Sequence, residues 1–136
     1  MFVKVSIIMS CYNSQATIGQ SVESILNQSY ENFELLICDD GSIDGTFREI
    51  EKYSKADKRI SIFKNEKNVG LTKSLNLLIN KSDGEFIARQ DDDDISLSHR
   101  IETQIKVIKD LNLDFATSRA KILGTDKLIP GLSFNL

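Results

Sequence analysis

The feature that most constrains this fold is a regular alternation of short apolar runs with segments of helical periodicity. Apolar runs rich in β-branched and aromatic residues lie at 3–11, 33–38, 60–63 and 85–88, and we interpret them as buried strands. Helical spacing follows each run: after residues 13–14, over 46–53, from 71 to near 84, and over 101–108. Strands that alternate with helices predict parallel βαβ units, with helices on both faces of one sheet. We therefore expect an α/β chain with a mostly parallel central sheet.

Three further local patterns refine this prediction. Thr46, followed by Glu49 three residues later, has the form of a capping box at a helix start. Short apolar stretches at 113–116 and 122–123 could form additional strands. One proline and seven glycines in 136 residues leave little material for linkers, so residues 1–136 are expected to form one domain.

Composition excludes several classes of protein. Hydrophobic residues make up 40% of the chain and charged residues 27%, which is typical of a globular domain. The net charge is −3 without a cluster of Lys and Arg, which argues against nucleic acid as a partner. The early apolar run at 5–9 is far shorter than the ~20 residues that span a bilayer, and it has no basic lead-in typical of a signal peptide. Cys11 and Cys38 are too few for a disulfide framework, so we expect reduced, half-buried thiols in a cytoplasmic chain.

Two acidic clusters each follow a predicted strand directly. Asp39 and Asp40 come after the second strand, and the run 91–94 of four aspartates comes after the fourth. Ligands of open parallel sheets bind at the carboxyl ends of the strands, so both clusters are expected to meet at one edge. Carboxylate oxygens suit Mg²⁺ or Mn²⁺, and Mg²⁺ commonly combines one or two carboxylates with substrate phosphates. The alternatives are an ordinary turn for the first cluster and a solvated, helix-capping loop for the second.

Other motifs of nucleotide and metal sites are missing from the sequence. It contains neither a phosphate-binding loop of the G-x-x-x-x-G-K-[ST] type nor a G-x-G-x-x-G after the first strand. A calcium loop that begins at Asp91 fails at Ile95 and Ser96. His99 is the single histidine, which we place on the surface at a helix start.

Four segments, taken in order, resemble the family 2 glycosyltransferases, which are inverting enzymes of GT-A fold. They are Val5 to Met9 with Tyr12-Asn13; Ser24 to Leu35 with Asp39-Asp40-Gly41-Ser42; Asn68 to Leu71 with Leu75-Asn76; and Gly84 to Arg89 with Asp91 to Ile95 and Arg100. The likeness extends from about residue 3 to residue 124 and implies a Rossmann-like GT-A βαβ sandwich.

The resemblance also implies roles for individual residues. It implies that Asp39 hydrogen-bonds the nucleobase of the donor. Asp40, Tyr12 and Asn13 would shape the nucleoside pocket. The remaining assignments concern the D-x-D region: Asp91 and Asp92 beside the ribose and diphosphate, Asp93 as the direct metal ligand, and Asp91 as a second candidate ligand.

The sequence departs from the family pattern at three points. Ser10 stands where many relatives have proline, and Leu75 stands where many have arginine, which leaves Lys73 as a candidate cationic contact to the donor. The third point is length, because in this family the acceptor-binding region and the general base follow the part of the sheet represented here. We therefore expect the N-terminal portion of a longer enzyme, with its general base beyond Leu136.

The function implied is metal-dependent, inverting transfer of a sugar from a nucleoside diphosphate sugar, with UDP as the expected nucleotide and Mg²⁺ or Mn²⁺ as cofactor. The expected acceptor is a hydroxyl group of a glycan or lipid-linked molecule, in polysaccharide or cell-surface glycan synthesis. The inner face of the membrane is an alternative location for the longer protein, and an unpaired sheet edge would favour a homodimer. Two other functions stay open: a non-catalytic module that binds nucleotide or metal, and a sugar nucleotidyltransferase.

Overall fold

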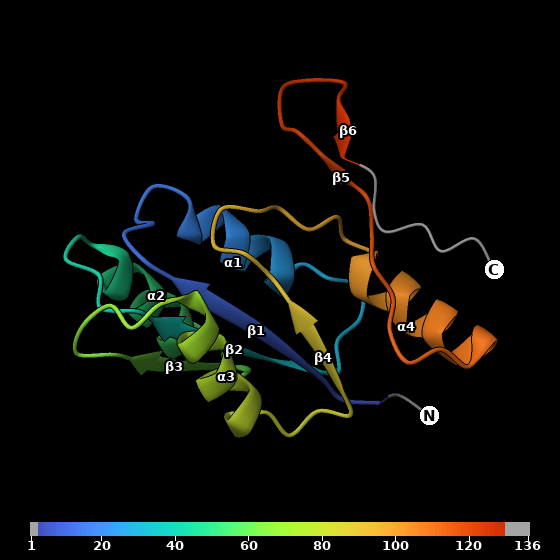
Figure 1. Cartoon of the computed structure of the whole chain (residues 1–136), viewed down its shortest axis with the longest axis horizontal. Coiled ribbons are helices and arrows are strands. Elements are labelled where there is room, and N and C mark those ends of the chain that lie inside the picture. The colour runs from blue at the N-terminus through green and yellow to red at the C-terminus, as the bar shows by residue number, and fades with distance from the viewer. Residues whose placement is uncertain (1–2, 130–136) are drawn as a thin grey trace.

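The computed structural model describes residues 3–129, which form an α/β fold followed by a small β-hairpin (Figure 1). The elements in chain order are β1 (Val5–Cys11), α1 (Ile18–Leu26), β2 (Phe33–Asp39), α2 (Thr46–Ala56), β3 (Ile60–Lys64), α3 (Leu71–Lys81), β4 (Phe86–Arg89), α4 (Arg100–Leu111), β5 (Ala120–Lys121) and β6 (Leu128–Ile129).

The central sheet is parallel throughout the described residues, and its strands have the order β3-β2-β1-β4. The chain builds outward from β1 to β2 and β3, then returns to place β4 on the other side of β1. This reversal of direction between β1 and β4 is the position at which open α/β sheets bind ligands. The predicted α/β class and parallel sheet are therefore confirmed.

Strand alternation divides the core into two layers. The larger cluster includes Val5, Ile7 and Met9 from β1 and is covered by α1, α2 and α4. The smaller cluster includes Ile8 and lies under α3. Figure 1 shows α1 and α3 on opposite sides of the sheet. Each fully buried aliphatic side chain contributes roughly 1.5–3 kcal/mol of transfer free energy, so both layers hold the sheet in place.

The helices form where the sequence repeats apolar residues at helical spacing. In α1, Ile18, Val22 and Ile25 share one face and are completely buried. In α4 the corresponding stripe begins with Ile101 and Ile105. These stripes hold α1 and α4 over the same face of the sheet, which fixes the loops at its carboxyl edge.

Three details of the predicted helix boundaries are wrong. Helix α1 begins at Ile18, after the start expected at residues 13–14. The capping box does not form, because Thr46 is the first residue of α2 and its backbone N–H is bound by the Asp44 carboxylate at 2.9 Å. The side chain that bonds a free N–H at this helix start is therefore Asp44, two residues before the expected Thr46. Aspartate can take this role because its carboxylate accepts from free N–H groups at a helix start. Helix α3 ends at Lys81, before Gly84, and Ser82 already has an extended backbone.

The predictions for the C-terminal strands also need correction. Residues 113–116 form no strand. The strand expected at 122–123 lies two residues earlier, at Ala120–Lys121, where it pairs antiparallel with β6. A short apolar run forms a strand only where a neighbour accepts its hydrogen bonds, and the sequence alone does not identify that neighbour.

The two thiols are more deeply buried than expected. Cys11 and Cys38 are free and completely buried, whereas the sequence suggested half-buried residues. Cys11 belongs to the larger core cluster and Cys38 to the smaller one, so they lie on opposite faces of the sheet.

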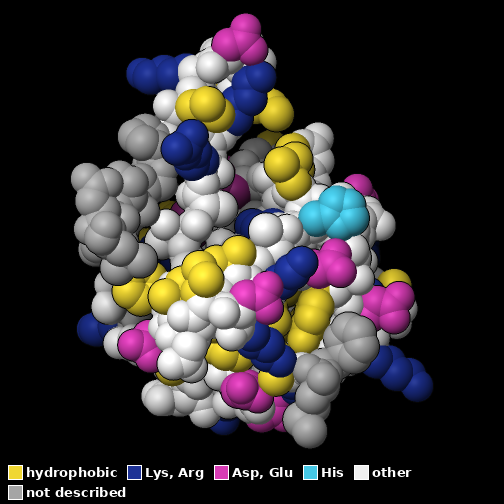
Figure 2. Space-filling view, turned by 90° about the vertical axis from the view of Figure 1, so that its right-hand side faces the viewer, with side chains coloured by type: hydrophobic (Ala, Val, Ile, Leu, Met, Phe, Trp, Pro, Cys, Tyr) yellow, Lys and Arg dark blue, Asp and Glu magenta, His cyan; other side chains and the backbone are white. Residues whose placement is uncertain are grey.

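The β5–β6 hairpin projects from the body of the fold (Figure 1) and its strand residues are exposed. On the face seen in Figure 2, hydrophobic, acidic and basic side chains are intermixed. Within residues 3–129, no helix has the length and apolar character needed to cross a membrane.

Candidate functional site: the carboxyl edge of β1, β2 and β4

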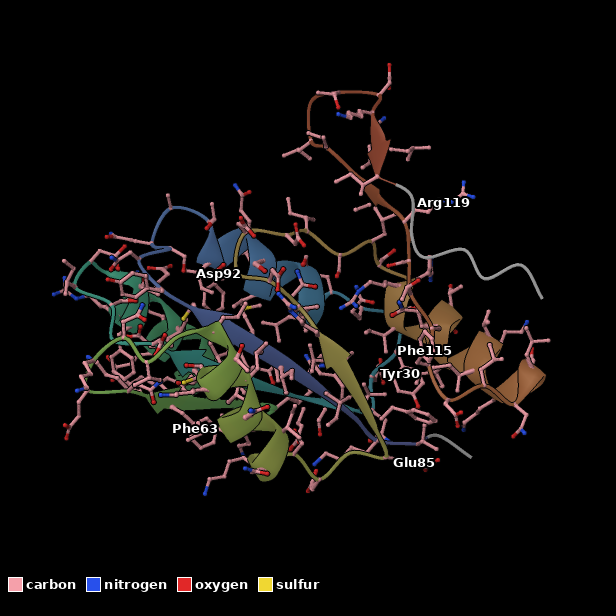
Figure 3. All side chains as sticks on the ribbon, in the orientation of Figure 1. Tyr30, Phe63, Glu85, Asp92, Phe115 and Arg119 are labelled. Carbon is pink, nitrogen blue, oxygen red and sulfur yellow. The ribbon has the colours of Figure 1, made fainter. Side chains whose placement is uncertain are left out.

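The two acidic clusters lie on either side of the end of β1. The backbone N–H of Asp40 donates to the carbonyl of Cys11 at 2.8 Å, which joins the ends of β1 and β2. The backbone N–H of Tyr12 donates to the carboxylate of Asp92 at 3.3 Å, and this carboxylate belongs to the loop after β4 (Figure 3). The convergence predicted from the sequence is therefore observed.

Asp39 has a buried carboxylate with one oxygen left over. Its Oδ1 accepts a hydrogen bond from the backbone N–H of Ser42 at 3.0 Å. Its Oδ2 is buried and has no hydrogen-bond partner among the described residues. Because an unpaired buried acceptor costs about 1–3 kcal/mol, a ligand that donates an N–H to this oxygen would gain affinity there.

Asp40 organises the segment that leads into α3. Its carboxylate accepts hydrogen bonds from the backbone N–H groups of Val69 and Gly70, both at 2.9 Å, and from the side-chain amide of Asn65 at 2.8 Å. Burial alone would raise the pKa of this carboxyl group, but these hydrogen bonds outweigh burial and hold the pKa below its usual value. With both oxygens engaged, Asp40 shapes this edge of the sheet through the loop that it holds.

The turns after β1 and β2 are joined to each other. Asn13 has a left-handed backbone with φ +50°. Its side-chain oxygen accepts from the N–H of Ile43 at 3.0 Å, and its own N–H donates to the hydroxyl of Ser42 at 2.9 Å. Tyr12, directly before it, is 47% exposed at this edge of the sheet. The pair thus combines a fixed turn with an accessible aromatic ring.

The carboxylates of the acidic loop 91–94 differ in their partners, their exposure and their pKa. Asp91 is held by Arg89, whose Nε and Nη2 donate to its two oxygens at 2.9 and 3.2 Å. Asp93 is exposed. Partial burial of the carboxyl group, together with the charges of Asp91 and Asp93, raises the pKa of Asp94 above its usual value. The loop is therefore a crowded acidic site that a cation would relieve.

These carboxylates fit a metal that completes its coordination with substrate oxygens. Within residues 3–129, no group of three or more His, Cys, Asp or Glu side chains could hold a metal ion without other ligands. Mg²⁺ and Mn²⁺ accept hard oxygen ligands, and one or two carboxylates suffice when a diphosphate supplies the others. Asp93 is the accessible predicted ligand, whereas Asp91 would have to exchange Arg89 for the metal.

The remaining predicted residue, Lys73, lies exposed on the first turn of α3. Within residues 3–129, no hydrogen bond or ion pair joins Lys73 to the acidic loop, so its role as a cationic contact stays a prediction. His99 is the exposed N-cap residue of α4, as predicted.

The structure identifies one site residue that the sequence reasoning missed. Gln90, between β4 and the aspartates, is only 4% exposed, and its side-chain amide bonds the backbone of the acidic loop. The sequence held one usable signal, namely an uncharged amide placed between a buried strand and four carboxylates. Two of its partners, Ser21 and Arg100, lie on α1 and α4, however, so the spacing alone did not reveal how the side chain is held.

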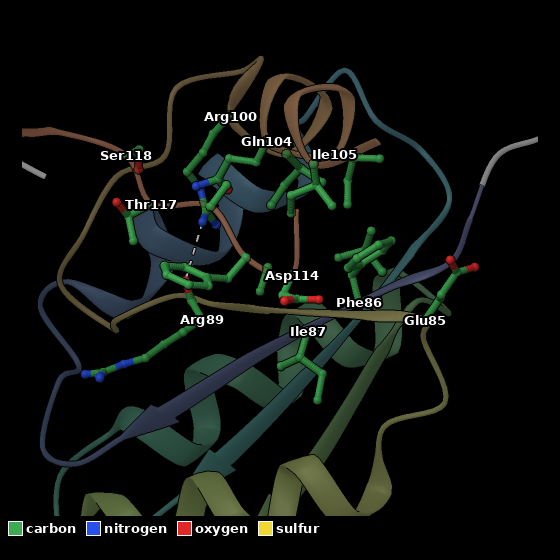
Figure 4. Close-up of a pocket in the computed structure, with 16 residues that line it drawn as sticks. Glu85, Phe86, Ile87, Arg89, Arg100, Gln104, Ile105, Asp114, Thr117 and Ser118 are labelled. Carbon is green, nitrogen blue, oxygen red and sulfur yellow. Dashed lines mark hydrogen bonds between the residues drawn. The ribbon is translucent and has the colours of Figure 1, made fainter. Parts of the chain in front are cut away.

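A separate hollow lies between β4, α4 and residues 114–118, with a volume of about 600 Å³ (Figure 4). The guanidinium group of Arg100 lies at this hollow and donates to the carbonyl of Arg89 at 3.4 Å. None of the predicted nucleotide- or metal-binding residues lines it. The hollow therefore does not correspond to the predicted donor site.

Comparison with known proteins decides the family. The model of the family described as "Glycosyl transferase family 2" matches residues 6–129. The chain belongs to this family. It is 44% identical over 98 residues to an uncharacterized glycosyltransferase of Haemophilus influenzae, covering 72% of this chain and 30% of that protein. It is 37% identical over 125 residues to the Escherichia coli enzyme WfgD, a UDP-Glc:alpha-D-GlcNAc-diphosphoundecaprenol beta-1,3-glucosyltransferase, covering 92% of this chain and 49% of WfgD.

A solved structure agrees with the GT-A fold. Residues 1–349 of Staphylococcus aureus TarS in complex with UDP superimpose with a TM-score of 0.73 at 28% identity, covering 79% of this chain and 32% of that one. The chain thus spans less than half the length of each of these three relatives.

Proposed function

We propose that this chain forms the donor-binding part of a glycosyltransferase that moves a sugar from a nucleoside diphosphate sugar to an acceptor hydroxyl. The observation that carries the proposal is the meeting of two acidic clusters at the carboxyl ends of adjacent strands, in a member of family 2. One cluster offers a buried acceptor at Asp39, and the other offers exposed carboxylates.

The proposed donor is a UDP-sugar. The name of WfgD specifies UDP-Glc as donor, and TarS has been solved with UDP and with UDP-GlcNAc. In this chain the free Oδ2 of Asp39 would accept the N–H of a uracil ring, with the Tyr12 ring and the Asn13 turn beside the nucleoside. Asp40 would act indirectly, by holding the backbone of the loop before α3.

The proposed cofactor is Mg²⁺ or Mn²⁺, held by Asp93 and by Asp91. Such a cation would stabilise the charge that develops on the departing diphosphate. Asp92, fixed by the backbone N–H of Tyr12, would keep the acidic loop close to the nucleoside side of the edge. Arg89 balances the charge of Asp91 and would release it when the donor complex forms.

The acceptor side belongs to the longer protein that we propose. Inverting transfer requires a general base that removes the acceptor proton while the anomeric carbon develops positive charge. We place that base beyond Leu136 and propose a glycan or lipid-linked acceptor, as in polysaccharide or cell-surface glycan synthesis; the name of WfgD specifies a diphosphoundecaprenol-linked acceptor. The cytoplasmic location and the homodimer stay predictions.

Isothermal titration of UDP into the chain tests the donor site. Binding is expected with Mn²⁺ and is expected to be lost with EDTA or in Asp93→Ala. Asp39→Asn places an amide where the base would donate, so about tenfold weaker binding is expected from one lost hydrogen bond. Asp110→Ala changes an exposed carboxylate of α4 and serves as the control. If UDP, GDP and dTDP all fail to bind with Mn²⁺ present, the donor-site proposal is wrong for this chain.

A further inference from the structure

We propose that Gln90 is a positioning residue for the metal and the diphosphate. Its buried side-chain amide holds the backbone of the acidic loop 91–94 so that the carboxylates of the loop gather at the edge of the sheet. This inference rests on the proposed function, since it assigns a role at the same site.

The amide nitrogen of Gln90 binds both ends of the acidic loop. Its Nε2 donates to the carbonyl of Asp94 at 2.8 Å and to the carbonyl of Asp91 at 3.3 Å. It also lies 3.3 Å from the hydroxyl of Ser21 on α1. A single side chain therefore fixes the first and last peptide groups of the four-aspartate run.

The amide oxygen of Gln90 is equally occupied. Its Oε1 accepts from the hydroxyl of Ser96 at 2.6 Å and from Nη2 of Arg100 at 3.2 Å. These partners lie directly after the loop and at the start of α4, so they fix the orientation of the amide. Since both ends of the amide are engaged, Gln90 has little freedom to turn away from the loop.

Helix α1 provides a second attachment for the same loop. The hydroxyl of Ser21 donates to the carbonyl of Asp91 at 2.7 Å, and the hydroxyl of Ser24 accepts from the N–H of Ser96 at 3.0 Å. The carbonyl of Asp91 is thus bound to α1, while the side chain of Asp93 is exposed. These contacts from the protein hold the backbone at both ends of the loop.

This order has a consequence for binding. Four neighbouring carboxylates repel one another, and a free loop would spread them apart. When other side chains hold the loop backbone, a cation supplies less of the free energy of gathering its ligands, although Asp91 must still exchange Arg89. Groups that orient metal ligands from behind typically change metal affinity by about 10–100-fold when they are removed.

The test compares two identical substitutions, Gln90→Met and Gln28→Met. Gln28 is also buried, at 6% exposure, and its amide bonds the carbonyls of Ser24 and Leu97 at 3.1 and 2.8 Å and accepts from the N–H of Ile101 at 3.1 Å. Both variants lose a buried amide beside α1 and α4, but only Gln90 contacts residues 91–94. Urea unfolding of each full chain measures the shared structural effect.

Mn²⁺ affinity in the presence of UDP measures the positioning effect. Gln90→Met is expected to bind Mn²⁺ about 10–100-fold more weakly, and Gln28→Met is expected to match the wild type. Equal Mn²⁺ affinities in the two variants would overturn the positioning role while leaving the donor site in place. Failure of the wild type itself to bind Mn²⁺ with any of UDP, GDP and dTDP would overturn both proposals.

If Gln90→Met does not fold, Ser21→Ala provides the second variant. It removes the hydroxyl that contacts both the Asp91 carbonyl and the Gln90 amide, and about fivefold weaker Mn²⁺ binding is expected. Ser29→Ala removes a hydroxyl bonded to Glu102 and serves as its control. Unchanged Mn²⁺ affinity in Ser21→Ala would contradict the proposal.

Discussion

Asp40→Asn tests whether one buried carboxylate organises the segment before α3. Asp40 is 2% exposed and accepts three hydrogen bonds, two of them from the backbone N–H groups of Val69 and Gly70. Asparagine has nearly the same shape but replaces one acceptor oxygen with an NH₂ group. In either orientation of the new amide, at least one backbone N–H faces another donor.

The magnitude follows from this geometry. A hydrogen bond to a charged group contributes about 1.5–3 kcal/mol, and a buried donor left without a partner costs about 1–3 kcal/mol. Since these two effects describe largely the same lost contact, they are not added. We expect the free energy of unfolding to fall by about 2–3 kcal/mol in Asp40→Asn.

Urea unfolding, with the slope and midpoint fitted together, measures this loss. The matched control is Asp83→Asn, because Asp83 is an exposed carboxylate whose ion pair with Lys4 is screened by solvent, and little change is expected. An Asp40→Asn midpoint as close to the wild type as that of Asp83→Asn would refute the reasoning.

The stability lost in Asp40→Asn is also expected to depend on pH. The folded pKa of Asp40 lies below its unfolded value, so its contribution is complete above the unfolded pKa of about 3.9 and is lost as the pH falls through the folded pKa. The difference in stability between wild type and Asp40→Asn should therefore be constant from pH 7 to about pH 5 and should shrink in more acidic solution. A difference that grows on acidification would contradict this account.

Two further predictions concern the core and the site turns. Gly41→Ala is expected to lower the free energy of unfolding by about 2–4 kcal/mol, because φ is +76° and a Cβ would lie 2.5 Å from the backbone of Lys67. Gly124 has the same φ, but within residues 3–129 no atom lies within 4 Å of an added Cβ, so urea unfolding of Gly124→Ala should show a loss of only about 1 kcal/mol. Equal losses would exclude the close approach as the cause. Burial raises the pKa of the thiols of Cys11 and Cys38, so a thiol reagent at pH 8 should label the native chain far more slowly than the urea-unfolded chain. Rapid labelling of the native chain would show that the sheet opens readily.

The sequence by itself determined the type and order of the main elements. Side chains alternate along a strand and repeat every 3.6 residues along a helix, so local spacing predicted β1 to β4 and α1 to α4. It also placed Asp39 and Asp91 directly after strands, which was enough to predict a shared edge because parallel strands end on the same side. These are short-range properties, and neighbouring residues encode them.

The tertiary structure alone decided how that edge is built. Sequence spacing does not contain the strand order, yet the order places β1 between the two acidic clusters. The contact of Ser21 with the Asp91 carbonyl joins residues 70 positions apart, and that of Asp40 with Gly70 joins residues 30 apart. In the sequence, Gln90 cannot be distinguished from an ordinary polar residue. Its role becomes visible only in its contacts with Ser21 on α1 and Arg100 on α4. Such contacts depend on where distant elements meet, and that placement results from burying both faces of the sheet at once.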